Sequence, residues 1–156
     1  GYGFCALALL SILGEIKKIN IDKAINWCAK RQMPYEGGFN GRTNKLVDTC
    51  YTWWVGSMCR ILANEVNIPP FWNEEGMSKW VLTVCQDRNG GCFDKPGKRP
   101  DLFHTMYGLT GLSVTAQERI NEQTGFRLAD IDARYAIPKE SVTKIQEYFK
   151  DIPFTP

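Results

Sequence analysis

The sequence lacks both a strong net charge and a long apolar run. Lys and Arg total 19 and Asp and Glu total 17, so the formal net charge is only +2. This charge is too small to indicate binding to nucleic acid or to a membrane surface. No apolar run approaches the roughly 20 residues that cross a bilayer, and the opening GYGFCALALLSILG is short and has no basic leader. We therefore expect no nucleic-acid partner and no membrane span.

Cysteine is also sparse for a disulfide-bonded scaffold. Six cysteines occur in 156 residues, and several lie within apolar runs. We interpret Cys5, Cys28, Cys59 and Cys85 as reduced core residues, which indicates a reducing compartment and predicts a cytoplasmic protein. With 44% hydrophobic and 23% charged residues, the chain is long enough to bury a core. Disorder is therefore not expected for most of it.

Apolar residues recur at helical spacing in six segments, and no segment shows sustained strand alternation. The predicted helices cover residues 2–13, 21–29, 47–63, 77–85, 102–114 and 142–149. Asp22, Asp48 and Asp101 stand near the starts of three of them, as acids at helix N-termini should. The sequence predicts one all-α domain over residues 1–156. Because the first helix begins without a cap or an initiator Met, we expect the chain to be the C-terminal part of a longer polypeptide.

Two loops between the predicted helices repeat one another. Each begins with a Gly-Gly pair, at Gly37-Gly38 and Gly90-Gly91, and reaches an Asp eleven residues after its first glycine, at Asp48 and Asp101. The offset is 53 residues in both comparisons. A repeat of this kind stacks helical hairpins, so equivalent helices begin on the same face. We therefore expect Asp48, Cys50 and His104 to converge at one rim of the domain.

The three converging residues offer an oxygen, a sulfur and a nitrogen ligand. This mixed set suits zinc, and three protein ligands leave a fourth position open for a substrate, as in catalytic sites. Each residue also has a simpler interpretation. Asp48 alone is more often an N-cap, Cys50 a small core residue, and His104 a hydrogen-bonded core histidine.

Basic residues stand beside this candidate site. Arg42 and Lys45 lie at a helix mouth, where free backbone N–H groups also favour a phosphate or diphosphate. In the second loop, Lys98 and Arg99 are as consistent with a solvated loop as with a binding role. Asp94 lies among lysines, where it either pairs with them or holds a magnesium ion against a diphosphate.

The same helices carry several aromatic residues. By base rate these are core residues, but the lining of an apolar cavity requires the same residue types, so both uses remain open. They are Tyr51, Trp53, Trp54, Phe103 and Tyr107.

Two long motifs, RQMPYEGGFNGRTNKLVDTCYTWW and GGCFDKPGKRPDLFHTMYGLTGLS, resemble the β subunits of the protein prenyltransferases, and specifically the farnesyltransferase type. GYGFCALALL at the start and YAIPKESV near the end support the resemblance, which covers nearly the whole chain. It implies an α-α barrel (toroid) of repeated helical hairpins, of which this chain supplies roughly the C-terminal half. An incomplete barrel is therefore expected.

The resemblance also implies roles for particular residues. The family's zinc ligands fall on Asp48, Cys50 and His104, and its isoprenoid diphosphate contacts fall on Arg42, Lys45 and Tyr51. Trp54 and Tyr107 match positions that line the lipid cavity. Phe103 stands where the farnesyl enzyme has a Tyr beside the substrate peptide, and Asp94 matches that enzyme's magnesium-associated acid.

The implied activity is zinc-dependent transfer of a farnesyl group from farnesyl diphosphate to the cysteine thiol of a C-terminal CaaX motif. Lys45 and Tyr51 would assist the zinc ligands in catalysis, and a prenyltransferase α subunit would be the partner. Three alternatives remain: a geranylgeranyltransferase type I β subunit, a Rab-type geranylgeranyltransferase β subunit, and a non-catalytic helical-repeat module that binds a peptide or lipid.

Overall fold

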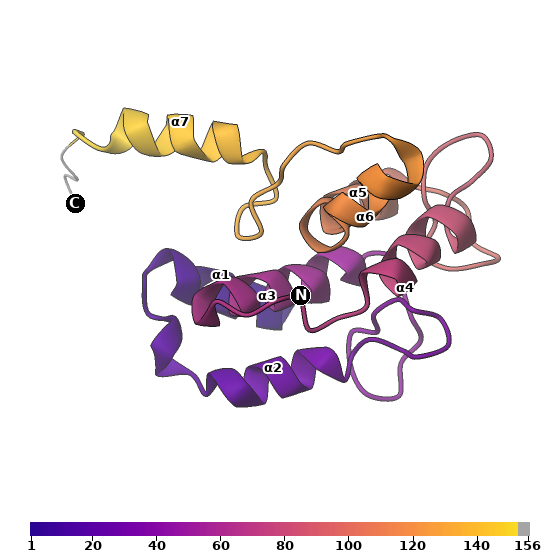
Figure 1. The fold of residues 1–156 in the computed structure, drawn as a ribbon, viewed down its shortest axis with the longest axis horizontal. Helices are drawn as coiled ribbons and strands as arrows, with labels where there is room; N and C mark the ends of the chain where they lie inside the picture. The colour runs from indigo at the N-terminus through magenta and orange to yellow at the C-terminus, as the bar shows by residue number, and fades with distance from the viewer. Residues whose placement is uncertain (153–156) are drawn as a thin grey trace.

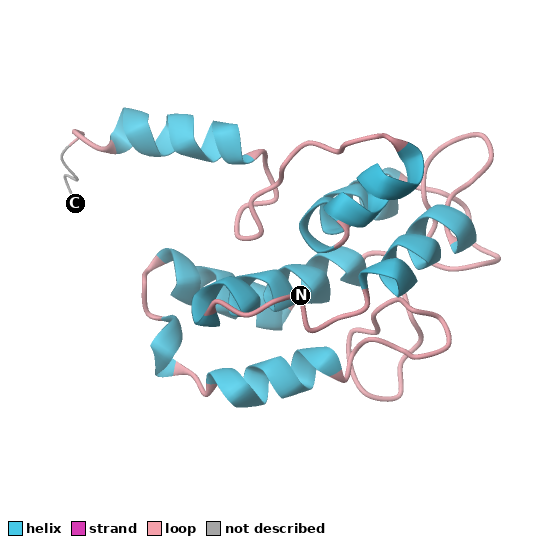
Figure 2. Ribbon diagram, in the orientation of Figure 1, coloured by secondary structure: helices cyan, strands magenta, loops and turns pink. Residues whose placement is uncertain are grey.

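The computed structural model describes residues 1–152, apart from the side chain of Gln123, and these residues form helices joined by loops (Figure 1). Over this range the regular structure is entirely helical, with isolated β-bridges in the loops (Figure 2). The elements are α1 (Tyr2–Ile12), the 3-10 turn η1 (Ile16–Lys18), α2 (Ile21–Ala29), α3 (Tyr51–Val66), α4 (Glu74–Lys79), the π-helical turn η2 (Trp80–Val84), α5 (Leu102–Thr115), α6 (Gln117–Thr124) and α7 (Lys139–Phe149).

The all-α prediction is confirmed, with several boundaries shifted by three or four residues, two of them with a clear local cause. The helix expected from residue 47 begins at Tyr51, because Val47 and Asp48 form an extended segment whose backbone bonds to the preceding loop. The helix expected over 77–85 begins earlier, at Glu74, where the side chain of Asn73 accepts a hydrogen bond from the Gly76 N–H. Its second half widens into the π-helical turn η2.

Helix α6 was not predicted. It packs through few apolar side chains, since Ile120 is its one buried hydrophobic residue among those described. A helix with so few apolar residues lacks the helical spacing of apolar positions on which the prediction relied.

The core is organised around α3, which packs against α1, α2 and α5 (Figure 1). Trp53, Cys59 and Leu62 of α3 are almost fully buried, and Phe4 and Leu7 of α1 cover them. A second apolar cluster fills the space beneath the loop that precedes α5. In the described residues, no helix is both long and apolar enough to cross a bilayer.

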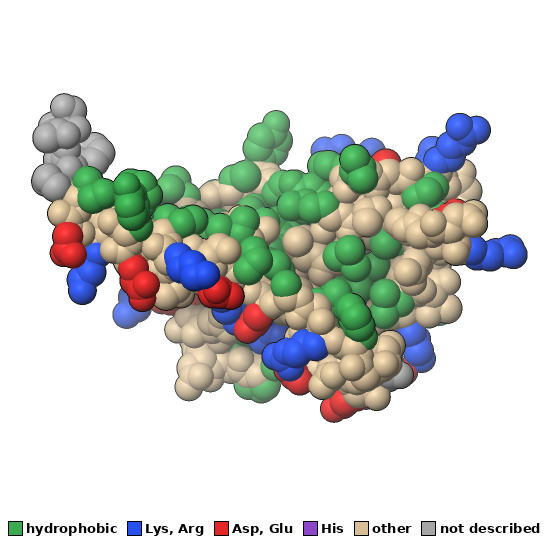
Figure 3. All heavy atoms as spheres, turned by 90° about the horizontal axis from the view of Figure 1, so that it is seen from above, with side chains coloured by type: hydrophobic (Ala, Val, Ile, Leu, Met, Phe, Trp, Pro, Cys, Tyr) green, Lys and Arg blue, Asp and Glu red, His purple; other side chains and the backbone are tan. Residues whose placement is uncertain are grey.

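Helix α7 extends away from this core (Figure 1). Val142 is its buried residue, whereas Ile145, Tyr148 and Phe149 are exposed. Seen from above, hydrophobic side chains gather over this helix (Figure 3). Along the described chain, α7 therefore leaves an apolar face uncovered.

The internal repeat is confirmed by backbone hydrogen bonds. We call residues 30–50 the first loop and residues 85–101 the second loop. Each loop is closed by a hydrogen bond across nine residues and carries a turn in the same place. The paired bonds are Asp48 N to Phe39 O at 3.3 Å and Asp101 N to Cys92 O at 3.2 Å, then Lys45 N to Arg42 O at 3.3 Å and Lys98 N to Lys95 O at 3.2 Å.

A third loop, between α6 and α7, is closed by the same kind of hydrogen bond but lies at the other end of α5. Lys139 N donates to Asp130 O at 2.8 Å, again across nine residues. This loop packs on the C-terminal end of α5, where the hydroxyl of Ser113 donates to Ala129 O at 2.6 Å and accepts from Ile131 N at 3.1 Å. The sequence hides this copy because it has no Gly-Gly pair. The first and second loops meet at the opposite end of α5.

Replacing Gly111 by Ala should destabilise the fold. A Cβ at this position would lie 2.4 Å from the carbonyl carbon of Thr52 and 2.6 Å from the backbone N of Trp53. Neither backbone atom can move without separating α3 from α5, so we expect the free energy of unfolding to fall by about 1–3 kcal/mol. Urea unfolding followed by circular dichroism measures this change.

Gly3→Ala is the matched control, because its Cβ would meet the flexible end of Met58, 3.3 Å away. We expect that variant to stay within about 1 kcal/mol of wild type. Equal stability of the two variants would contradict the close packing at Gly111.

Candidate functional site

The structure brings Asp48, Cys50 and His104 together, as the repeat predicts. One potential ligand atom from each residue lies within 4.8 Å of the others. Nε2 of His104 is 3.4 Å from Oδ1 of Asp48. Asp48 and Cys50 end the first loop, and His104 lies in the first turn of α5, so the convergence depends on α3 and α5 starting side by side.

Local hydrogen bonds fix the two residues from the first loop. Oδ1 of Asp48 accepts a hydrogen bond of 2.8 Å from the backbone N–H of Cys50. Cys50 is the residue before α3, and its side chain is buried in the rim. The carboxylate therefore supports the start of α3 while facing the thiol and the imidazole.

His104 is oriented by a second carboxylate, that of Asp101. Oδ1 of Asp101 caps α5 by accepting from the His104 N–H at 2.8 Å, and its Oδ2 is 2.7 Å from Nδ1 of His104. These bonds lower the pKa of Asp101. With Nδ1 bonded to this carboxylate, the other ring nitrogen, Nε2, is directed at Asp48 and is the atom free to bind a metal ion. Sequence reasoning identified Asp101 only as a helix-start acid, although the Asp-x-x-His spacing signals this second role.

The thiol of Cys50 has a raised pKa. Burial is the main cause, and the hydrogen bond and negative charge of Asp48 add to it. In the metal-free chain the thiol therefore stays protonated at neutral pH. A bound cation reverses this balance, because a metal ion stabilises the thiolate far more than the surroundings disfavour it.

The three residues fit a zinc ion. They supply one carboxylate, one thiol and one imidazole, which leaves a fourth tetrahedral position open. Two atoms bound to a tetrahedral zinc ion lie about 3.3 Å apart, close to the 3.4 Å between His104 and Asp48. Within residues 1–152, they form the one group of three or more potential ligands that could hold a metal ion.

A cavity of about 430 Å³ is lined in part by Tyr51, the residue that follows Cys50 in the chain. Its lining combines the basic side chain of Arg42 and the ring of Tyr51 with Tyr2 and Cys5 of α1. The ring of Tyr51 lies directly on Gly41, where a Cβ would be 2.1 Å from the ring carbon that carries the hydroxyl. The interpretation of Cys5 as a core residue is wrong, since its side chain is exposed at this cavity, whereas Cys28, Cys59 and Cys85 are buried and unpaired as predicted.

The remaining basic and acidic residues lie around this rim. Lys45 is exposed on the same turn as Arg42. Asp94 forms an ion pair with Lys95, so the structure places this acid in the lysine pairing that was the alternative to a magnesium site. Lys98 and Arg99 are exposed in the second loop.

An aromatic series runs from α1 to the cluster. Ring centroids are 5.5 Å apart for Phe4 and Trp54, 4.6 Å for Trp54 and Tyr107, 4.6 Å for Tyr107 and Phe103, and 5.1 Å for Phe103 and His104. Trp54, Phe103 and Tyr107 keep part of their surface accessible. Trp53, in contrast, is a core residue with 1% exposure. Sequence reasoning did not identify Phe4 as a member of this aromatic series.

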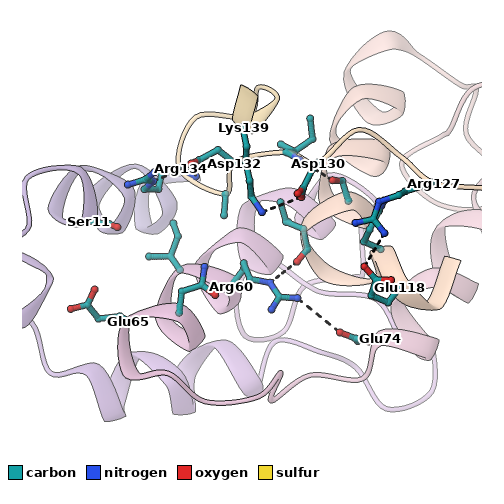
Figure 4. Close-up of a pocket in the computed structure, with 17 residues that line it drawn as sticks. Ser11, Arg60, Glu65, Glu74, Glu118, Arg127, Asp130, Asp132, Arg134 and Lys139 are labelled. Atoms are coloured by element: carbon teal, nitrogen blue, oxygen red, sulfur yellow. Dashed lines mark hydrogen bonds and ion pairs between the residues drawn. The ribbon is translucent and has the colours of Figure 1, made fainter. Parts of the chain in front are cut away.

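A larger cavity, of about 510 Å³, lies away from the cluster between α3, α5, α6 and the third loop (Figure 4). Apart from Glu65, its charged side chains pair with one another: Arg60 with Glu74, Arg127 with Glu118, Arg134 with Asp132 and Lys139 with Asp130. Arg60 also donates to Val114 O at 2.8 Å. The Arg127–Glu118 pair ties the third loop to α6, and the Arg60–Glu74 pair joins α3 to α4. We therefore interpret the cavity as structural.

Comparison with known proteins places these features in a family. Residues 1–147 match the family model described as "Prenyltransferase alpha-alpha toroid domain". Farnesyltransferase β subunits from Pyricularia oryzae and Schizosaccharomyces pombe are 37% and 45% identical, over 95% and 76% of this chain and 36% and 33% of theirs.

A solved structure, Candida albicans protein geranylgeranyltransferase-I complexed with GGPP, aligns with a TM-score of 0.73 and 29% identity over 97% of this chain and 43% of its own. The chain spans about a third of the length of the curated relatives. From the near-complete match to the family model and these identities, the chain belongs to the prenyltransferase family and carries its alpha-alpha toroid domain.

Proposed function

We propose that this chain is part of the catalytic β subunit of a zinc-dependent protein prenyltransferase that transfers a farnesyl group to the cysteine of a C-terminal CaaX motif. Residues 1–156 would supply the C-terminal part of the toroid, and a prenyltransferase α subunit would be the partner. The observation that carries the proposal is the Asp48, Cys50 and His104 cluster beside the cavity that Arg42 and Tyr51 line.

Asp48, Cys50 and His104 would hold the zinc, and Asp101 would keep Nε2 of His104 directed at it. Zinc bound there supplies a Lewis acid that lowers the pKa of a coordinated substrate thiol and so favours the nucleophilic thiolate. The buried position of Cys50 excludes water from one side of the site. Phe103 and Tyr107 would line the space in which the substrate peptide binds.

Arg42, Lys45 and Tyr51 would stabilise the diphosphate as it leaves C1 of the isoprenoid. Arg42 and Tyr51 line the same cavity, so a cation and a phenolic donor are directed at one place. Burial raises the pKa of Tyr51, which keeps its proton available for donation. Their effect grows as charge builds on the leaving group. Tyr2, Cys5 and Trp54 would contact the isoprenoid chain.

The choice of a farnesyl group rests on Asp94 and on the farnesyltransferase relatives. Asp94 would help a magnesium ion to bind the diphosphate, for which it must exchange its pairing with Lys95. The second candidate is geranylgeranyl transfer of type I, favoured by the structural likeness to the Candida albicans enzyme. Competition between farnesyl and geranylgeranyl diphosphate for one CaaX peptide distinguishes the two.

Cys50→Ala should abolish prenyl transfer by the chain in complex with its α subunit. The substitution removes the sulfur ligand and leaves a zinc site of two residues, so we expect bound zinc to be lost while the helical circular dichroism signal is kept. Transfer of a labelled farnesyl group to a CaaX peptide measures the effect.

Cys59→Ala, also a buried cysteine of this region but outside the cluster, is the matched control and should keep its zinc and its activity. Full turnover by the Cys50→Ala variant would refute the proposal. Peptide or lipid binding that persists in a chelator, without transfer, would favour the non-catalytic module instead.

Asp101→Ala should weaken zinc binding about 10- to 100-fold, because the imidazole of His104 loses the carboxylate that orients it. Asp101→Asn keeps a side-chain cap for α5 but not the negative charge at Nδ1, so it separates the two roles of this residue. Competition with a chromophoric chelator measures both affinities. Wild-type affinity in both variants would show that His104 needs no such partner.

A further inference from the structure

We propose that Thr49, which lies between Asp48 and Cys50, is a positioning residue that holds the second loop, and with it Asp94 and Lys95, beside the cluster. This inference rests on the proposed function, because the second loop matters only if a diphosphate binds there. The repeat does not predict it. The counterpart of Thr49, 53 residues further on, is Leu102, which is 89% exposed.

Thr49 joins the two loops through both its backbone and its side chain. Its N–H donates to the carbonyl of Asp94 at 2.9 Å. Its hydroxyl lies 2.9 Å from the carbonyl of Phe93 and 3.0 Å from that of Asp94, and its single proton is shared between them. A residue of the first loop thus bonds directly to the backbone that carries Asp94.

The side chain of Thr49 is completely buried and closely packed. It has 0% exposure, and a Cβ on Gly108 of α5 would lie 3.1 Å from its methyl carbon. The thiol of Cys85, at the start of the second loop, donates to the same Asp94 carbonyl at 3.9 Å. Without the hydroxyl, the carbonyl of Asp94 keeps the Thr49 N–H as a donor, but the carbonyl of Phe93 loses its bond to Thr49. Since a buried carbonyl without a donor is costly, we expect the loop to shift at Phe93 rather than leave this carbonyl unpaired.

The position of the second loop matters because it carries charged residues beside the cluster. Thr49, between Asp48 and Cys50, bonds directly to the backbone of Asp94, whose carboxylate pairs with Lys95. Both charged side chains are therefore tied to the segment that supplies two of the proposed zinc ligands. A shift of the loop would displace the Lys95 ammonium from the diphosphate while leaving the zinc ligands in place.

The test compares Thr49→Val and Thr49→Ser in the full chain assembled with a prenyltransferase α subunit. We expect Thr49→Val to keep one zinc per chain and to bind farnesyl diphosphate about tenfold more weakly in calorimetric titration, the loss of one buried hydrogen bond. Thr49→Ser retains the hydroxyl and should stay within about threefold of wild type. If the valine variant does not fold, Thr49→Ala, which cannot overpack the site, is compared with Thr49→Ser in the same way.

Thr115→Val is the matched control, because Thr115 also has 0% exposure and its hydroxyl bonds within α5, to Gly111 O at 2.7 Å. It should bind diphosphate as wild type does. Wild-type diphosphate affinity in Thr49→Val, or equal loss of zinc and diphosphate in the valine and serine variants, would overturn the role of Thr49 alone. A wild-type complex that binds neither zinc nor diphosphate would overturn the proposed function and this inference together.

Discussion

The close contact of α3 with α5 is the constraint on which the rest of the structure depends. Gly111 allows the two backbones to meet, and Gly108 makes room for Thr49 one turn earlier. Because both helices begin at the same end, their first turns bring the ends of the two loops together. Asp48, Cys50 and His104 become neighbours for this reason, although 54 residues separate Cys50 from His104.

This arrangement also explains how a buried thiol and two carboxylates coexist at one rim. Each carboxylate makes a hydrogen bond that stabilises the fold in addition to its role in the site. Asp48 accepts from the Cys50 N–H, and Asp101 caps α5 by accepting from the His104 N–H. These hydrogen bonds therefore partly offset the negative charges of the two carboxylates before any ligand binds. Beside them lie the protonated thiol of Cys50 and Nε2 of His104, and these three residue types together form a donor set that suits a divalent metal ion.

Much of the fold and the meeting of the three cluster residues could be predicted, because both follow from periodicity and from the 53-residue repeat. The roles of Asp101 and Thr49 could not, since they depend on where a side chain points once the loops are folded. Helix α6 was missed because it buries so little apolar surface, and Cys5 was placed wrongly because an apolar helix does not reveal which of its faces meets a cavity. The pairing of Asp94 with Lys95 is one of two uses that the sequence left open.

The proposed chemistry requires that Asp48, Cys50 and His104 bind a single zinc ion through one carboxylate, one thiolate and one imidazole. X-ray absorption at the zinc edge, on the chain loaded with one equivalent of zinc, reports these ligands. We expect one sulfur neighbour at about 2.3 Å and nitrogen or oxygen neighbours at about 2.0–2.2 Å. A shell with no sulfur, or with several sulfurs, would contradict this ligand set, as would a folded chain that retains no zinc.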